Sequence, residues 1–473
     1  MRISEKIIKR GFAKAEQTFD YCWNVLHDLK RMSIKEKDFT DRFIKFQERL
    51  AETILMLHEI REEIIVEEKS RVQNKSKYNF KWFKQRMKDL SIYKSGIDKI
   101  VNIAKALGDA YAYFFYQFDL DWLEEHLSHQ RVINSAAGIG EKGEVEFLKK
   151  IKQIDGQFVI YHGITNILRY GDFSFIDLKQ FKVVQIGELK TKKIDDNTLQ
   201  LSLSLLKHKR IKVTNHTPFL KDSDLKKNRR GRQMLGIIKF LENTKKTERN
   251  INVNVTTEFY FKDMNLLYKN TKTNSTKTRQ VSKGLAFSAS KFGKSSLFNK
   301  IFLRNPTSVV TKETSQIQGT VIKLMKPESK NNSCIINQML YDWDFSDKSA
   351  PGTVPIFWYP LNIELLRKLY FVEYYIIALF NPAYLIEDVQ DLGFIVESKY
   401  CANTNMAEPK YFIQRFDRFI SYITDHLQTE SFVIDCIKEI QKHPEKEKAT
   451  SFLVKPQQRI RLHDPNLYND NEG

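Results

Sequence analysis

The stretch FKVVQIGELKTKK, residues 181–193, decides the fold that we expect for this chain. Its apolar run predicts a strand over Phe181–Thr191. Side chains two residues apart on a strand share a face, so Glu188 and Lys190 point the same way as apolar Ile186. The sequence therefore predicts a carboxylate and an amine at the rim of a sheet whose face is anchored in a core.

The preceding stretch ITNILRYGDFSFID, residues 164–177, supplies a partner strand and a second acid. We expect a strand over Asp172–Leu178 and a short turn after it, so antiparallel pairing places Asp172 roughly opposite Glu188. Two carboxylates on one sheet face repel each other unless a cation lies between them. Oxygen ligands of this kind suit Mg²⁺ or Mn²⁺, so the hairpin predicts a divalent-metal site.

A helix predicted over Glu144–Ile154 precedes these strands and follows the small-residue segment SAAGIGEKG. Three acids lie at its start, namely Glu141, Glu144 and Glu146. Glu144 precedes apolar Phe147 by three residues, which places it near the buried side of the helix. We therefore select Glu144 as the third acid of the site.

At these residues the chain resembles the PD-(D/E)XK, or restriction-endonuclease-like, nuclease superfamily. The matching segments are the helix GEVEFLKKI, the Asp-bearing strand within residues 164–177 and the Glu-x-Lys strand within residues 181–193. The resemblance covers about residues 135–210 and departs from the family pattern at Gly171, where a proline is typical. It implies an α/β fold with a mixed sheet flanked by helices, and metal-dependent hydrolysis of DNA or, less often, RNA.

The resemblance and the chemistry of phosphodiesters give each residue an expected role. A bound Mg²⁺ neutralises the phosphate charge, lowers the pKa of a coordinated water and stabilises the leaving oxygen. We expect Asp172 and Glu188 to hold the metal, with the Leu189 carbonyl as a further ligand. Lys190 would contact the attacking water or the scissile phosphate. Glu144 would complete the metal shell directly or through water.

The charge of the chain favours a polyanionic partner. Its formal net charge is +19 and its pI about 9.4, and Lys and Arg contacts to phosphates release counterions. A lysine-rich proteome is the alternative explanation. From Met264 to Lys312 the sequence contains no acid at all. We expect DNA rather than RNA as the partner. The expected contacts lie at the end of the Glu-x-Lys strand and at a predicted helix start: Lys192, Lys193, Lys226, Lys227, Arg229, Arg230 and Arg232.

The patterning of the chain predicts three parts. Residues 1–130 are predicted to form a helical bundle domain, because apolar residues recur there at three and four spacings. The aromatic patch Tyr111–Phe118 is expected to be core rather than a platform for bases. Residues 131–330 form the expected nuclease-like domain with a basic insertion or extension, and residues 331–473 a largely helical region.

Three further segments carry expectations about secondary structure. Leu199–Leu206 alternates leucine with polar residues and fits a strand or a helix. Ser315–Met325 predicts a strand. Leu369–Ile386 predicts a buried helix, because it is too short and too polar to span a membrane comfortably.

The sequence predicts neither a signal peptide nor a membrane anchor, because the charged N-terminus lacks an apolar segment. The four cysteines are far apart and form no Cys-x-x-Cys pair, which disfavours a zinc ribbon and a disulfide framework. We therefore expect a cytoplasmic protein. The helical N-terminal domain is the expected surface for a second copy or a partner protein.

The leading hypothesis is a Mg²⁺-dependent nuclease, and the family resemblance implies a role in restriction or defence against foreign DNA. Two other functions stay open. SASKFGKS, residues 288–295, matches the Walker A loop except that Ser288 replaces its first glycine, so a P-loop nucleotide-binding switch is one alternative. A catalytically inactive nuclease-fold scaffold that binds nucleic acid is the other.

Other patterns compete with the chosen site. Glu397-Ser398-Lys399 is a rival Glu-x-Lys, but Asp391 precedes it by only six residues, too near to lie on a separate hairpin strand. The acidic segment YDWDFSD, residues 341–347, lacks the glycine and terminal Glu of a calcium loop, so a solvated loop is expected. His162, on a predicted strand, is expected to be an ordinary hydrogen-bonded histidine.

Overall fold

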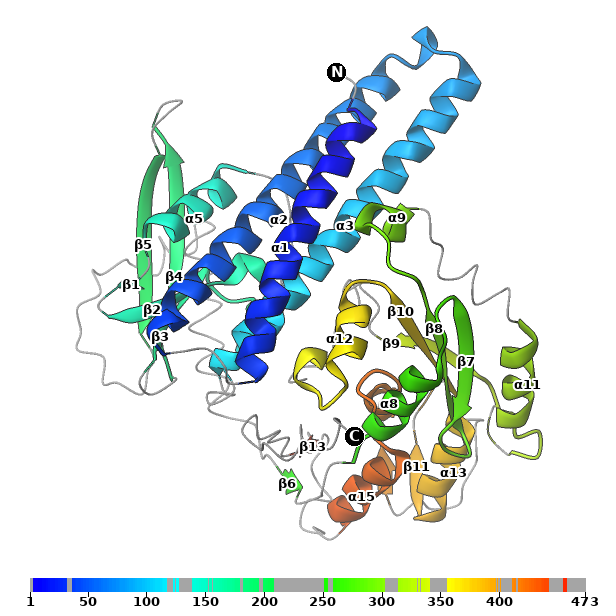
Figure 1. Ribbon diagram of the computed structural model, residues 1–473. Helices are drawn as coiled ribbons and strands as arrows, with labels where there is room; N and C mark the ends of the chain where they lie inside the picture. Colours follow the sequence, from blue (N-terminus) through cyan, green and yellow to red (C-terminus); the bar gives the residue numbers. More distant parts are fainter. Residues whose placement is uncertain are drawn as a thin grey trace, which may run out of the picture.

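The computed structural model describes residues 3–31, 36–116, 122–123, 125–126, 138–151, 153–154, 156–178, 182–194, 199–207, 251–253, 258–302, 314–329, 331, 333–340, 355–396, 398, 400, 411–413, 416–441 and 454–456. Within them the chain is a mixed α/β protein, which confirms the coarse fold class expected from the sequence. A bundle of long helices, a five-stranded sheet and a four-stranded sheet are its main parts (Figure 1).

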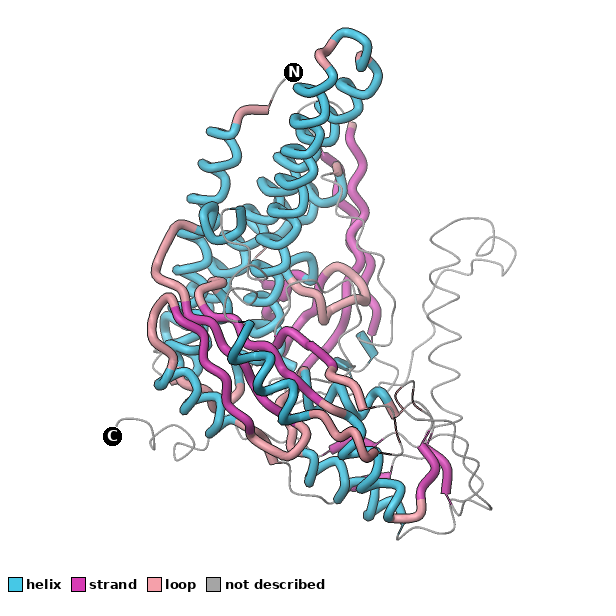
Figure 2. Tube along the Cα trace, turned by 90° about the vertical axis from the view of Figure 1, so that its right-hand side faces the viewer, coloured by secondary structure: helices cyan, strands magenta, loops and turns pink. Residues whose placement is uncertain are grey.

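Three long helices form the bundle expected near the N-terminus. They are α1 (Glu5–Lys30), α2 (Glu36–Gln73) and α3 (Phe80–Tyr116), with the 3₁₀ helix η1 (Lys75–Lys77) between α2 and α3. Buried residues recur at helical spacing, as Phe12, Ala15 and Phe19 do on α1. None of the described helices combines the length and apolarity needed to cross a membrane. The tip of the α2–α3 hairpin extends beyond both sheets (Figures 1 and 2).

The first sheet has five strands in the order β1–β2–β3–β4–β5, and every neighbouring pair is antiparallel. The mixed sheet that the resemblance implied is therefore not found among the described strands. Its elements are α5 (Ile139–Lys150), β1 (Gln153–Ile154), β2 (Gln157–Tyr161), η2 (His162–Ile164), β3 (Phe173–Asp177), β4 (Lys182–Lys193) and β5 (Leu199–Lys207). The predicted hairpin is confirmed as β3–β4, with Phe173 opposite Gly187. The segment left open between strand and helix is β5, which pairs with β4.

One side chain of α2 makes hydrogen bonds to two backbone groups of β2. Gln47 Nε2 donates to the Val159 carbonyl at 2.9 Å, and Gln47 Oε1 accepts from the Tyr161 amide at 2.8 Å. Gln47 is fully buried, so its amide satisfies two backbone groups as a neighbouring strand does. The first sheet is therefore docked on the bundle through the strand that leads into the candidate site.

The second sheet has the order β7–β8–β10–β9 and is also antiparallel throughout. Its strands are β7 (Ser275–Gln280), β8 (Leu285–Lys291), β9 (Ile336–Leu340) and β10 (Tyr374–Phe380). The helices of this part are α8 (Phe261–Asn270), α9 (Leu297–Phe302), α11 (Thr314–Leu324), η3 (Ile356–Trp358), α12 (Ile363–Tyr370), α13 (Pro382–Asp391), α14 (Asp417–Thr424) and α15 (Glu430–Gln441). Two short parallel pairs are β11 (Phe394–Val396) with β12 (Tyr411–Ile413), and β6 (Ile251–Val253) with β13 (Val454–Pro456). Figure 2 shows the strands of the two main sheets as separate groups.

This second sheet crosses the expected domain boundary between residues 330 and 331. β7 and β8 precede that point in the sequence and β9 and β10 follow it, yet all four strands are hydrogen-bonded in one sheet. The part after residue 331, expected to be largely helical, combines α12–α15 with the strands β9–β13. The division that the sequence suggested cuts through one structural unit.

Two secondary-structure predictions in this part are wrong. The segment predicted as a buried helix, Leu369–Ile386, has strand β10 at its centre, because a short run that is apolar on every side fits a buried strand equally well. Ser315–Met325, predicted as a strand, lies largely in helix α11. Ile317, Val321 and Leu324 share one helical face there and pack against the second sheet.

The bundle and the second sheet meet through aromatic side chains. The Trp23 ring of α1 lies 5.3 Å from Phe357 and 5.5 Å from Tyr370, measured between ring centroids. The Trp358 indole donates to the Ala110 carbonyl of α3 at 2.9 Å. Lys30, at the end of α1, is buried in the same interface and donates to the Phe357 and Tyr359 carbonyls at 2.7 and 2.8 Å.

Candidate active site

The candidate site begins at a left-handed turn before β3. Gly171 has a φ of +69°, and a side chain there would meet the Ile186 side chain and the Gly187 carbonyl. The Asp172 amide donates to that carbonyl at 2.8 Å. The Leu189 amide in turn donates to Asp172 Oδ2 at 2.7 Å. Asp172 therefore lies against the Glu188–Leu189 peptide, which confirms the pairing that the sequence predicted.

The hydrogen bond from Leu189 also fixes the direction of its carbonyl. In an extended strand the N–H and C=O of one residue point to the same side, as in the paired residues of an antiparallel ladder. The Leu189 amide points to Asp172, so the Leu189 carbonyl faces the same neighbour strand. A carboxylate and a carbonyl oxygen thus lie together at the end of the β3–β4 pair.

Helix α5 covers one face of this sheet. A Cβ on Gly143 of α5 would lie 2.1 Å from Thr191 Oγ1, and the Phe147 ring lies 4.8 Å from Phe173, the residue opposite Gly187. Residues 187, 189 and 191 of β4 therefore face α5, and the alternation of the strand directs Glu188 and Lys190 to the opposite face. Glu188 and Lys190 form an ion pair with each other there.

Glu144 reaches the site from α5 through Tyr161. The Tyr161 hydroxyl donates to Glu144 Oε2 at 2.8 Å. Burial raises the pKa of Tyr161 far above its usual value, and the negative charges of Glu144, Glu141 and Asp172 add to that rise. The Tyr161 hydroxyl therefore contacts Glu144, and it is expected to stay protonated.

The two other acids of α5 have different partners. Glu141 Oε1 lies 2.8 Å from His58 Nδ1 on α2, and Glu146 pairs with Lys149 at 3.1 Å. Of the three acids that the sequence offered, Glu144 is the one that contacts Tyr161.

The donor atoms fit a divalent metal only in part. Over the described ranges no group of three or more His, Cys, Asp and Glu side chains comes close enough to hold a metal ion. Mg²⁺ is commonly bound by one or two carboxylates, with waters and substrate phosphates as its other ligands. Asp172 accepts from the Leu189 amide and Glu188 pairs with Lys190, whereas Glu144 contacts Tyr161 from the α5 face.

His162 supports the backbone of Asp172, a role that the sequence did not reveal. The His162 amide donates to the Asp172 carbonyl at 2.9 Å, and its ring Nδ1 donates to the Gly171 carbonyl at 3.0 Å. In the neutral ring Nε2 then accepts, and Ser174 Oγ lies 2.5 Å from it. The expectation of a hydrogen-bonded histidine is confirmed.

The chain of hydrogen bonds continues into α3, and the donor and acceptor of each bond follow from its neighbour. Ser174 donates to His162, so it must accept from the Tyr116 hydroxyl, which contacts it. Tyr116 then accepts from Nε2 of His126 at 3.0 Å, and Nδ1 of His126 accepts from the Tyr170 amide at 3.1 Å. Each hydroxyl and each imidazole ring in this chain donates one of these hydrogen bonds and accepts another, which holds the turn before β3 in place.

A buried carboxylate fixes the loop that leads into the turn. Asp109 Oδ1 accepts from the Asn166 amide at 2.6 Å and from the Ile167 amide at 3.0 Å. Burial raises the pKa of Asp109 to about 6, and these hydrogen bonds limit the rise. α3 therefore anchors the middle of the segment between β2 and β3.

The basic residues that the sequence singled out for nucleic-acid binding lie in three places. Lys190, Lys192 and Lys193 are exposed at the end of β4. The expected helix-start cluster, residues 226–232, lies outside the described residues. In the acid-free window, Arg279 pairs with Asp263 at 2.9 Å and buried Lys300 with Glu373 at 2.6 Å. Not every cation of that window is therefore available to a nucleic acid.

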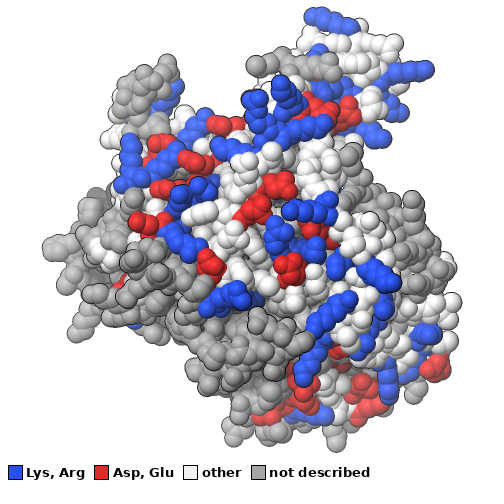
Figure 3. Space-filling view, in the orientation of Figure 1, with Lys and Arg blue, Asp and Glu red and all other residues white. Residues whose placement is uncertain are grey.

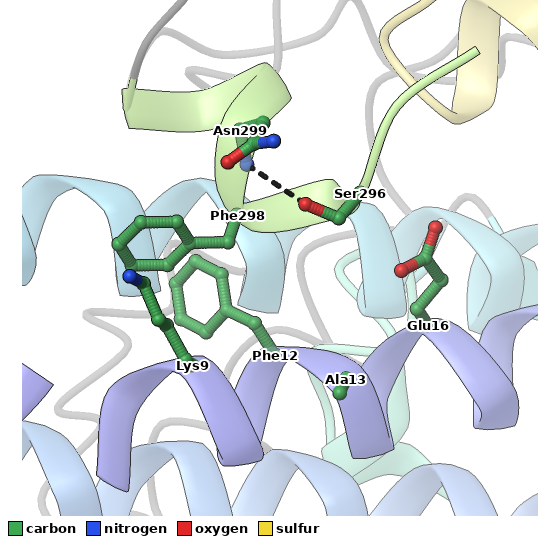
Figure 4. A pocket seen from close by; sticks show the side chains of 7 residues that line it. All are labelled: Lys9, Phe12, Ala13, Glu16, Ser296, Phe298 and Asn299. Atoms are coloured by element: carbon green, nitrogen blue, oxygen red, sulfur yellow. Dashed lines mark hydrogen bonds between the residues drawn. The ribbon is translucent and has the colours of Figure 1, made fainter. Parts of the chain in front are cut away.

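The Walker-like segment does not have the geometry of a phosphate loop. Its first four residues belong to β8, which is antiparallel to both neighbours, and Ser288 and Ser290 are buried against β7. The segment leads into α9, whose Leu297 amide donates to Glu16 of α1 at 3.4 Å. Figure 4 shows the pocket at this contact, where the Phe298 and Phe12 rings lie side by side and Glu16 stands at the other end. A carboxylate and aromatic rings at this place disfavour phosphate.

The rival Glu-x-Lys residues Glu397 and Lys399 and the acidic segment 341–347 lie outside the described residues.

No protein-family model, curated protein or solved structure matches this chain. The function must therefore be argued from the site itself.

Proposed function

We propose that this chain is a Mg²⁺-dependent nuclease that hydrolyses phosphodiester bonds of nucleic acid, with DNA as the favoured substrate. The observation that carries the proposal is the hydrogen bond from the Leu189 amide to the Asp172 carboxylate across the β3–β4 pair. It supports one metal position shared by Asp172, Glu188 and the Leu189 carbonyl. The restriction-endonuclease-like core and a role against foreign DNA belong to the same proposal and rest on the sequence resemblance.

Each side chain has a role that follows from its position. Mg²⁺ or Mn²⁺, when bound by Asp172 and Glu188, would supply charge neutralisation and an acidified water. Lys190 leaves Glu188 when a phosphate arrives, since its ammonium can pair with either anion, and it then holds the phosphate in line with the water. Glu144, through Tyr161 and a water, orients Asp172 from the α5 face.

The test is a cleavage assay that removes charge without removing the fold. Asp172→Asn keeps an oxygen that can accept from the Leu189 amide but lacks the carboxylate charge. Cleavage of single- and double-stranded DNA and RNA is measured with Mg²⁺, with Mn²⁺ and with EDTA. We expect the wild type to cut only with metal, and Asp172→Asn and Lys190→Ala to lose at least about a hundredfold in rate, as when a positioned catalytic group is removed.

Two matched substitutions serve as controls. Glu146→Gln removes an α5 carboxylate that pairs with Lys149, and Lys182→Ala removes an exposed lysine from the other end of β4. Both are expected to cut like the wild type. If Asp172→Asn cuts as fast as these controls, the site is misplaced. A wild type that binds nucleic acid but never cuts with either metal favours the inactive scaffold instead.

A further inference from the structure

The tip of the α2–α3 hairpin carries the densest acid-free basic segment that the bundle offers. Between residues 69 and 88 there are eight Lys and Arg residues and no Asp or Glu. The described tip is a separate projection of the surface, and several blue basic side chains extend from it (Figure 3). A surface of this charge complements a polyanion.

Aromatic rings are exposed within the same segment. Phe80 is 67% exposed and Trp82 37% exposed, although rings of this size are normally buried in a soluble protein. Tyr78, Phe80 and Phe83 line a pocket at the tip together with Lys75 and Ser76. By contrast, the aromatic residues at the end of α3 are core, as Tyr111 and Phe115 are fully buried.

The tip is held rigid by contacts beneath these rings. The Arg71 guanidinium lies over Tyr78 at 4.9 Å and over Trp82 at 5.3 Å, and it donates to the Tyr78 hydroxyl at 2.6 Å. Glu67 accepts from Arg71 at 3.3 Å and from buried Arg86 at 2.8 Å. Because these groups already support one another, Phe80 is the ring that remains most exposed for a ligand.

We propose that this tip binds single-stranded nucleic acid, with a base stacked on Phe80 in the aromatic pocket and phosphates on the surrounding lysines. Aromatic rings next to cations are the usual platform for unpaired bases, since every base has a stacking face. The choice of nucleic acid rather than a lipid surface rests on the proposed function and on the ring-lined pocket, which accepts a flat base.

The position of the tip relative to the first sheet can be followed along α2. The β4–β5 hairpin, with exposed Lys192 and Lys193, points to the same end of the molecule as the tip (Figures 1 and 2). Along α2, the distance from His58, the partner of Glu141, to Gln73 is about 22 Å for 15 residues. That length corresponds to roughly six or seven nucleotides at the rise of a stacked strand. A strand of twenty nucleotides is longer than this part of α2.

The experiment measures binding without chemistry. Fluorescence anisotropy with labelled dT20 in EDTA compares the wild type with Phe80→Ala, Phe80→Tyr and Val66→Ala. Phe80→Ala is expected to weaken binding about fivefold to a hundredfold, the usual effect of losing one stacking ring. Phe80→Tyr, which keeps a ring, and Val66→Ala, which shortens a 60% exposed apolar residue on α2, should bind like the wild type. Lys75→Ala with Lys77→Ala should flatten the dependence of log affinity on log salt by roughly 0.7 per lost phosphate contact.

The outcomes separate this inference from the proposed function. Unchanged dT20 affinity in Phe80→Ala overturns the inference, and so does a Phe80 dependence found only with phosphatidylserine vesicles, which would make the tip a lipid-binding surface. If Phe80→Ala weakens binding but no variant or wild type cuts, the proposed function fails while the tip assignment stands.

Discussion

At the scale of single residues, the candidate site depends on a backbone conformation. Gly171 adopts a positive φ. In the turn that it forms, the Asp172 carboxylate accepts a hydrogen bond from the Leu189 amide. The sequence drew attention to Gly171 only because it stands where the resembled family has a proline. Its physical role is different, since a proline could not adopt this φ.

A methyl group at Gly171 is expected to destabilise the fold. In Gly171→Ala the new Cβ would lie 2.4 Å from Ile186 Cγ2 and 2.9 Å from the Gly187 carbonyl oxygen, in a backbone region that favours glycine. We expect the free energy of unfolding to fall by about 2–4 kcal/mol, from strain and overpacking together. Urea unfolding measures it.

The control for this substitution is Gly140→Ala in the first turn of α5. Nothing lies within 4 Å of a Cβ built there. Alanine is the better helix former, so the same chemical change should raise stability by up to about 1 kcal/mol. Equal effects at the two glycines would show that the turn before β3 is not strained.

At the scale of elements, the first sheet is positioned by one glutamine rather than by strand pairing alone. Gln47 joins α2 to β2 by two hydrogen bonds, and β2 continues into Tyr161 and His162 of the site. The position of the sheet on the bundle is thus coupled to the position of Tyr161, which contacts Glu144.

Gln47→Leu is expected to destabilise the protein by about 2–4 kcal/mol. The substitution keeps the volume of the side chain but leaves a buried amide and a buried carbonyl without partners, each at a cost of about 1–3 kcal/mol. Thermal or urea unfolding gives the size of the effect. Gln73→Leu, at the exposed end of α2, should change stability by less than about 0.5 kcal/mol. A small effect at Gln47 would mean that water replaces its amide.

At the scale of the whole molecule, the bundle joins the two sheets. α2 carries the first sheet through Gln47, and α1 and α3 carry the second through Trp23, Lys30 and Ala110. Lys30 is the unusual member of this interface, because burial lowers its pKa from 10.5 to about 7. A neutral amine has two hydrogens, and two carbonyls accept from Lys30.

The pKa of Lys30 predicts how stability changes with pH. Its folded pKa of about 7 lies below the unfolded value of 10.5, so between these values the unfolded chain holds a proton that the folded chain has released. Raising the pH across this window therefore favours the folded state. The free energy of unfolding of the wild type, minus that of Lys30→Met, should rise by about 1.4 kcal/mol per pH unit between about pH 7.5 and 9.5.

Urea unfolding at several pH values checks this expectation. Lys14→Met, an exposed position on the same helix, should track the wild type at every pH. If the difference in free energy of unfolding between the wild type and Lys30→Met does not change between about pH 7.5 and 9.5, Lys30 keeps its proton in the folded protein.

The sequence by itself determined the long helices, the β3–β4 hairpin and the order of the site residues along it. Those features depend on local spacing: three and four residues in the bundle, and two along a strand. The same spacing correctly placed Glu188 with Lys190 on one face, and it singled out Glu144 among the acids of α5.

Only the tertiary structure decided what covers each face and which distant strands pair. It placed α5 on the face opposite Glu188, joined Tyr161 to Glu144, and joined β7 and β8 to β9 and β10 across the expected boundary. Periodicity tells which side chains of one element point the same way, but it carries no information about the element that packs against them. That depends on contacts between residues far apart in the chain, as the burial of Lys30 by Phe357 shows.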